Sequence, residues 1–158
     1  MGLEHERSTM SDVDPPREIR RTYTIIEDWL GGIRDTLTPY TNSLAADFTY
    51  VTPNGTRHDR RGALDVMTEA RGVHAESTPP LSIEIRDIEI RSPSHGVYLV
   101  TYEEFRRVGG EWRGRTSSAL LGETTETLTG LRWLHLQETA IDDRRDDNED
   151  DEAEDDRE

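Results

Sequence analysis

Two hydrogen-bonding side chains stand among bulky apolar residues in segment 130–139. The segment is typical of a β-strand, whose side chains alternate with a period of two, so His135 and Gln137 should share a face with Leu131 and Trp133. A histidine there could act as an acid or base near neutral pH, or donate a hydrogen bond to a ligand carbonyl. Gln137 has no proton to transfer, but its amide could orient a ligand. We therefore expect a concave binding face here, although a structural His135 is the simpler interpretation.

Two aspartates are further candidates for proton transfer. Asp59 follows His58, but adjacent strand residues point to opposite faces, so the two cannot form a dyad. An aspartate in an apolar cavity can serve as a general base. With Arg57, Arg60 and Arg61 around Asp59, however, a solvated loop is the simpler interpretation. Asp47 precedes an expected strand and is either a turn residue or a pocket acid, with a turn preferred.

Several larger side chains could line a small-molecule pocket together with Gln137: Trp29, Tyr50, Tyr102, Arg115 and Trp133. Aromatic residues at such positions are more often ordinary core. Arg115 is expected on the strand next to Glu103, so the two could meet as an internal ion pair. A surface position or a subunit interface is the simpler interpretation for both.

The sequence gives no support for a metal or cofactor. Cysteine is absent, and the five histidines at positions 5, 58, 74, 95 and 135 are scattered. None has the spacing of two or four residues that would place two histidine ligands side by side. A glycine-rich phosphate loop is also missing. We therefore expect neither a metal site nor a bound cofactor.

The charge of the chain limits the kinds of partner that we expect it to bind. The chain carries a net charge of -15, and in segment 142–158 twelve acidic residues stand against three arginines. Without a basic stripe to neutralise phosphates, nucleic acid is not an expected partner. No apolar run approaches the length of about 18 residues that a membrane span needs. We expect a cytoplasmic protein whose residues 142–158 form a disordered acidic tail.

All nineteen basic residues are arginine, and lysine is absent. Arginine is more weakly hydrated than lysine and binds carboxylates in a planar fork. An acidic surface without lysine suits a salt-rich cytosol, where screening over roughly 3 Å at 1 M removes self-repulsion. High genomic GC content would also favour arginine, so this pattern has two explanations. We expect a salt-adapted organism as the source.

The elements that must position these side chains follow from periodicity and turn signals. Apolar residues recur with helical spacing in 17–35, and shorter helices are expected from Thr38 and over 61–71. A strand at 48–52 turns at Pro53-Asn-Gly55 into a return arm at 56–59. Four strands then follow, at 81–91, 97–107, 111–122 and 128–141, and the first changes its alternation near Arg86 or Asp87, which predicts a bulge.

This order predicts an α+β domain in which an antiparallel four-strand meander and a short hairpin pack on about three N-terminal helices. We place a flexible leader at 1–14, the domain at 15–141 and the tail at 142–158.

The sequence resembles the nuclear transport factor 2-like superfamily, which includes SnoaL-like polyketide cyclases and ketosteroid isomerases. Three segments within 17–141 carry the resemblance. The first is DFTYVTPNG at 47–55 followed by Arg61-Gly62, and the second is 97–121 with Thr101-Tyr102 and RTSS at 115–118. The third, WLHLQET at 133–139, is similar to a closing strand of the type Trp-x-Ile-x-His-x-His-x-Ser.

The most similar subgroup comprises small uncharacterised domains that resemble the association domain of calcium/calmodulin-dependent kinase. The chain departs from the closing pattern at Leu131, Gln137 and Thr139, where the pattern has Trp, His and Ser. The resemblance implies a curved sheet wrapped into a cone around a pocket, and a homodimer formed through that sheet.

We expect a SnoaL-like domain that binds a small molecule in the cone pocket as a homodimer. One alternative is an isomerase, dehydratase or cyclase that uses His135, Asp59 or Asp47 as its acid or base. Another is a pure oligomerisation module. Glutamine at 137, where the family pattern has a second histidine, favours binding over proton transfer.

Overall fold

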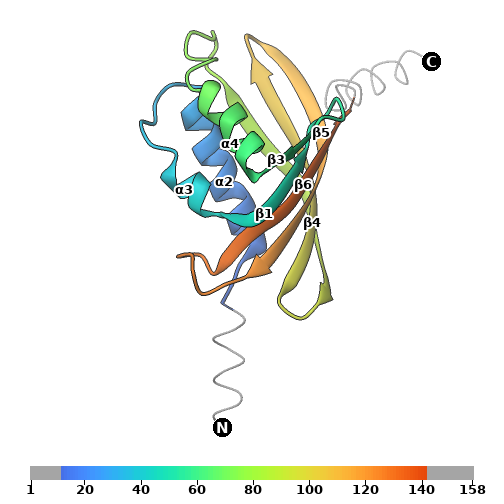
Figure 1. Ribbon diagram of the computed structural model, residues 1–158. Helices are drawn as coiled ribbons and strands as arrows, with labels where there is room; N and C mark the ends of the chain where they lie inside the picture. Colours follow the sequence, from blue (N-terminus) through green and yellow to red (C-terminus); the bar gives the residue numbers. More distant parts are fainter. Residues whose placement is uncertain (1–11, 142–158) are drawn as a thin grey trace, which may run out of the picture.

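The computed structural model of the protein describes residues 12–141, so the expected acidic tail and most of the expected leader lie outside the described residues. Residues 12–141 fold into three helices and six strands (Figure 1): α2 (Pro15–Leu30), α3 (Thr38–Asn42), β1 (Leu44–Val51), β2 (Arg57–Asp59), α4 (Arg60–Glu69), β3 (Ser82–Ser94), β4 (Val97–Val108), β5 (Glu111–Glu123) and β6 (Leu131–Ile141). None of the helices in 12–141 is long and apolar enough to cross a membrane.

The strands form one curved sheet in the order β2-β1-β6-β5-β4-β3, with the helices against one of its faces (Figure 1). Strands β3 to β6 are a continuous antiparallel meander, while β1 joins β6 in parallel and pairs with β2 as a short hairpin. The α+β prediction of a meander and a hairpin on N-terminal helices is confirmed. The sheet is unclosed, with β2 and β3 at its edges.

Helix α2 packs an apolar stripe into the core. Asp14 caps it by accepting a hydrogen bond from the Arg17 amide at 3.1 Å, and Ile19, Tyr23 and the following apolar positions are buried. The helix ends at Leu30, not near residue 35 as predicted. Gly32 adopts a φ of +77°, a conformation that favours glycine. Consequently Ile33 is 77% exposed and does not extend the stripe.

A bulge in β6 exchanges the two faces of that strand. Trp133 pairs with Leu121, but His135 pairs with Leu120, so Leu134 is an extra residue with no partner on β5. Before the bulge Leu131 and Trp133 are buried. After it the inward positions are Leu136, which packs against the core, and Glu138, which is 3% exposed.

The expected shared face of His135, Gln137, Leu131 and Trp133 is therefore wrong. His135 and Gln137 pair with Leu120 and Ser118, which lie on the outer face of the sheet. The predicted bulge in β3 is confirmed, because Asp87 has a φ of +57° and the pairing with β4 skips one residue between Arg86 and Glu89.

Candidate functional site

The candidate site is built around Glu138, an acidic residue on the inner face of β6. Its side chain is 2% exposed and accepts three hydrogen bonds from three different elements. Tyr23 of α2 donates to Oε2 at 3.2 Å, while Tyr50 of β1 at 2.7 Å and Nη1 of Arg115 on β5 at 2.8 Å both donate to Oε1. A buried carboxylate needs such partners, because desolvation is otherwise costly.

A second layer continues from these contacts towards β4. The Tyr102 hydroxyl lies 2.8 Å from that of Tyr23, and the two rings meet edge to face. Glu104, also on β4, has a fully buried side chain that forms an ion pair with Arg106. We call Tyr23, Tyr50, Tyr102, Arg115 and Glu138 the Glu138 cluster.

The surroundings of Glu138 and of neighbouring Glu104 shift the pKa values of these two carboxyl groups in opposite directions. Burial acts to raise the pKa of Glu138, but Arg115, Arg106 and the Tyr50 hydroxyl together hold it below its ordinary value. Burial raises the pKa of Glu104, and the nearby charge of Glu138 adds to this against the opposing effect of Arg106. Glu138 is thus the stable carboxylate of the pair.

The tyrosines act as hydrogen-bond donors in this setting. Burial raises the pKa of Tyr23 and Tyr102 well above the ordinary value, and burial followed by the charge of Glu138 raises that of Tyr50. Each phenol therefore stays protonated at physiological pH.

The cluster meets solvent at the β1–β2 hairpin. A depression of about 470 Å³ is lined by Tyr50, Thr52, Pro53, Asn54, Thr56, His58 and Arg115. The His58 ring stacks on Tyr50 with centroids 6.1 Å apart, and the Arg115 side chain is 26% exposed. Among the described residues Arg115 makes one hydrogen bond, through Nη1, while a guanidinium carries five N–H donors. The depression thus presents unused donors beside two stacked rings.

Of the residues predicted to line a ligand, the structure brings three together. Tyr50, Tyr102 and Arg115 all belong to the Glu138 cluster. The two tryptophans lie elsewhere in the core. Nε1 of Trp29 donates to the Met67 carbonyl at 2.6 Å, and Nε1 of Trp133 donates to buried Glu18 at 3.0 Å. Arg115 forms an ion pair with Glu138, whereas Glu103 lies opposite Thr116 of β5.

The predicted acid and base residues lie apart from the cluster. His135, on the outer face, has its Nδ1 2.6 Å from the hydroxyl of Thr49. Asp59 is the N-cap of α4 and accepts from the Gly62 amide at 2.9 Å. Asp47 is exposed. Gln137 is also exposed, so the structure gathers none of these with Glu138.

Sequence reasoning missed Glu138 and Tyr23. Tyr23 falls within the apolar spacing expected of the helix over 17–35, and a phenol hydroxyl leaves no periodic signal of its own. Glu138 was hidden by the bulge, because uninterrupted alternation places it on the outer face. No group of three or more histidine, aspartate or glutamate side chains in 12–141 is placed to hold a metal ion.

Comparisons with known proteins place the fold. No family model and no curated protein matches the sequence. Among solved structures, a nuclear transport factor 2-like protein of unknown function from Pseudomonas aeruginosa is similar, with a TM-score of 0.71 and 27% identity over 80% of this chain and 97% of its own.

Two more distant structures share the fold. The calcium/calmodulin-dependent kinase II hub of S. rosetta has a TM-score of 0.55 at 10% identity, covering 65% of this chain and 79% of its own. A putative ketosteroid isomerase from Parabacteroides distasonis has a TM-score of 0.54 at 7% identity, covering 72% and 81%. The helices on a curved six-strand sheet and these likenesses together identify the chain as a member of the nuclear transport factor 2-like superfamily.

Proposed function

We propose that the protein binds a small molecule through an oxygen acceptor at the depression beside Arg115. The observation that carries the proposal is the position of Arg115, whose Nη1 is held by Glu138 while its side chain lines the depression and is 26% exposed. A carboxylate matches the planar fork of an arginine. The stacked rings of Tyr50 and His58 supply a flat apolar surface for the body of the ligand.

Binding is favoured over catalysis by the burial of the acidic groups. The side chains of Glu104 and Glu138 are 0% and 2% exposed, so a ligand in the depression meets Arg115 and Tyr50 before it meets a carboxyl group. A general acid or base must lie within hydrogen-bond reach of its substrate. His135, Asp59 and Asp47, the groups on which the enzyme alternative was based, do not line this depression.

We further propose that the domain works as a homodimer through the outer face of the sheet. On β5 this face carries Thr116, Ser118 and Leu120, and on β6 it carries His135 and Gln137, so none of these five neighbouring positions is aspartate, glutamate or arginine. One third of the chain is charged, at 34%. Depletion of charge is typical of the centre of a protein interface.

The ligand proposal is tested with benzoate as a probe, followed by calorimetry, with benzyl alcohol as the neutral analogue. We expect benzoate to bind and benzyl alcohol to bind at least tenfold more weakly, a difference of about 1.4 kcal/mol. Arg115→Lys keeps a positive charge beside Glu138 but loses the fork, so it should also weaken benzoate binding about tenfold. Arg113→Gln, at a 77% exposed position on the same strand, is the matched control.

Equal binding of benzoate to Arg115→Lys and wild type would overturn the role of Arg115. Native mass spectrometry of the purified protein would show any ligand that is already bound. The dimer is tested by light scattering with Leu120→Arg, which should yield monomers. Ile33→Arg, at an exposed site away from the sheet, should not, and a monomeric wild type would refute the dimer.

A further inference from the structure

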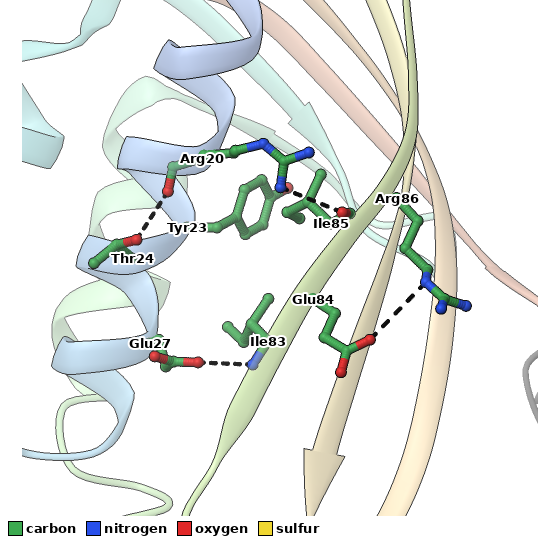
Figure 2. Close-up of a pocket in the computed structure, with 8 residues that line it drawn as sticks. All are labelled: Arg20, Tyr23, Thr24, Glu27, Ile83, Glu84, Ile85 and Arg86. Atoms are coloured by element: carbon green, nitrogen blue, oxygen red, sulfur yellow. Dashed lines mark hydrogen bonds and ion pairs between the residues drawn. The ribbon is translucent and has the colours of Figure 1, made fainter.

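A second cavity, of about 440 Å³, lies between helix α2 and the edge strand β3 (Figure 2). The helix contributes Arg20, Tyr23, Thr24 and Glu27, and the strand contributes Ile83 to Arg86. Because β3 is the last strand of the sheet, this wall of the cavity is backbone that no other strand within 12–141 covers. We call this cavity the α2–β3 groove.

Two side chains of α2 contact that backbone directly. Oε2 of Glu27 accepts from the Ile83 amide at 2.7 Å, and Nη1 of Arg20 donates to the Ile85 carbonyl at 3.4 Å (Figure 2). In an antiparallel ladder the N–H and C=O of one residue point to the same side, and alternate residues share that side. The Ile83 carbonyl and the Ile85 amide therefore also face the groove.

These remaining groups form a slot for one residue of an extended, peptide-like molecule. An acceptor is offered at Ile83 and a donor at Ile85, on either side of Glu84, which is the spacing with which a residue of a parallel strand bonds to its neighbour. The Tyr23 ring and the isoleucine side chains provide the apolar contact. The backbone thus presents groups that complement the N–H and the carbonyl oxygen of one residue, and not a hydrocarbon.

Opposite charges mark the two ends of the slot. Arg20 and Glu27 are seven residues apart on α2, a separation of about 10 Å along the helix axis. Within the described residues, each side chain uses one atom on β3, Nη1 for Arg20 and Oε2 for Glu27. The other N–H groups of Arg20 and Oε1 of Glu27 remain to bind a ligand.

We propose that the α2–β3 groove binds a zwitterionic, peptide-like molecule of dipeptide size. Its ammonium pairs with Glu27 and its amide N–H donates to the Ile83 carbonyl. Its carboxylate pairs with Arg20 and accepts a hydrogen bond from the Ile85 amide. This site is distinct from the depression at Arg115, since the two share no lining residue. They are connected, because Tyr23 lines the groove and donates to Glu138, which is held by Arg115 from the other side.

The test uses glycyl-leucine as the probe, with amide chemical shifts and calorimetry as the readouts. We expect the Ile85 amide to shift on titration. Acetylation of the probe's amine or amidation of its carboxylate should each weaken binding about tenfold or more. Glu27→Gln and Arg20→Gln should do the same, and Glu27→Gln keeps an acceptor for the Ile83 amide. Arg17→Gln, at an exposed position one turn before Arg20, is the matched control.

Combining a modified probe with a variant gives a sharper criterion, because the proposal pairs the amine of the probe with Glu27 and its carboxylate with Arg20. The acetylated probe should bind wild type and Glu27→Gln equally, because the interaction that the variant removes is already missing. The proposal is wrong if glycyl-leucine leaves the chemical shift of the Ile85 amide unchanged and its binding does not depend on Arg20 and Glu27. Arg115→Lys should leave glycyl-leucine binding unchanged, so the failure of one site is distinguishable from that of the other.

Discussion

Replacing Glu138 by glutamine tests whether a charged carboxylate holds the interior of the cone together. The substitution keeps the size of the side chain and one acceptor oxygen. It removes the charge that Arg115 contacts at 2.8 Å and that also stabilises Arg106. Breaking a buried ion pair costs about 3–5 kcal/mol. Because the Arg115 side chain is 26% exposed, we expect the lower end, about 3 kcal/mol.

The cost should depend on pH in a defined direction. The pKa of Glu138 is lowered in the folded protein from the reference value of 4.5. Its contribution to stability is therefore fully present above pH 4.5 and is lost as the pH falls through the lowered folded-state pKa. The difference in unfolding free energy between wild type and Glu138→Gln should be largest near neutral pH and shrink below pH 4.5.

Glu104→Gln provides the contrast at a neighbouring buried carboxyl. The pKa of Glu104 is raised from 4.5 in the folded state. Above pH 4.5 the folded protein therefore retains a proton that the unfolded chain has released. The contribution of Glu104 to the free energy of unfolding is thus lost as the pH rises above 4.5. Oε1 of Glu104 is buried without a hydrogen-bond partner among the described residues. Glutamine here breaks the ion pair with Arg106, but it also removes a buried carboxyl whose charged form is disfavoured by burial. Because these two effects oppose each other, we expect a cost of only about 1 kcal/mol at neutral pH.

Urea unfolding at several pH values measures both variants. Glu89→Gln, the same substitution at an exposed position, should stay within about 0.5 kcal/mol of wild type. The reasoning is refuted if Glu138→Gln costs less than Glu104→Gln at neutral pH. It is equally refuted if the cost of Glu138→Gln stays constant below pH 4.5 while the protein remains folded.

Three further substitutions probe the packing around the sheet. Gly114→Ala would place a Cβ 2.8 Å from the Phe105 ring, so calorimetric melting should show a loss of about 1–3 kcal/mol, whereas Gly122→Ala, which meets the flexible end of Leu134, should lose less. Trp133→Phe removes the donor to Glu18 and should cost at least about 1–3 kcal/mol in urea unfolding; a cost under 0.5 kcal/mol would contradict that contact's importance. Asp59→Ala removes the cap of α4 and should cost about 1 kcal/mol, with Asp59→Asn restoring most of it.

The elements of the fold were predictable because each depends on local chemistry. The stripe beginning at Ile19 fixed the buried face of α2, and the turn residues set the limits of the meander strands. The end of α2 was misplaced because Ile33 continues the apolar spacing, whereas the paired glycines before it terminate the helix. Of the two bulges, the one at Asp87 interrupts an apolar alternation and is visible in the sequence. The bulge at Leu134 is not visible in the sequence. Leu134 and Leu136 are two residues apart, so apolar residues continue at the spacing of a regular strand.

That second bulge decides which chemistry the cone contains. Without it, His135 and Gln137 would face the helices and Glu138 would face outward; with it, the carboxylate meets Tyr23, Tyr50 and Arg115. The enzyme hypothesis based on His135 therefore depended on a register that the backbone does not adopt. Only the pairing with β5 determines the face of each residue, since a shift of one residue moves every later side chain to the other side.

The resulting cluster is not explained by stability alone. A buried ion pair is often no more stabilising than apolar side chains of similar volume, while a pair with one partner removed is strongly destabilising. Glu138 is bonded to α2, β1 and β5 at once, so it can fix how these elements meet. Yet a buried carboxylate needs only hydrogen-bond partners. Arg115 supplies one of them through a single nitrogen, and its side chain also lines a depression open to solvent. A guanidinium that is oriented from inside and exposed on its other side is preorganised to receive an oxygen acceptor, which is why we assign the cluster a binding role.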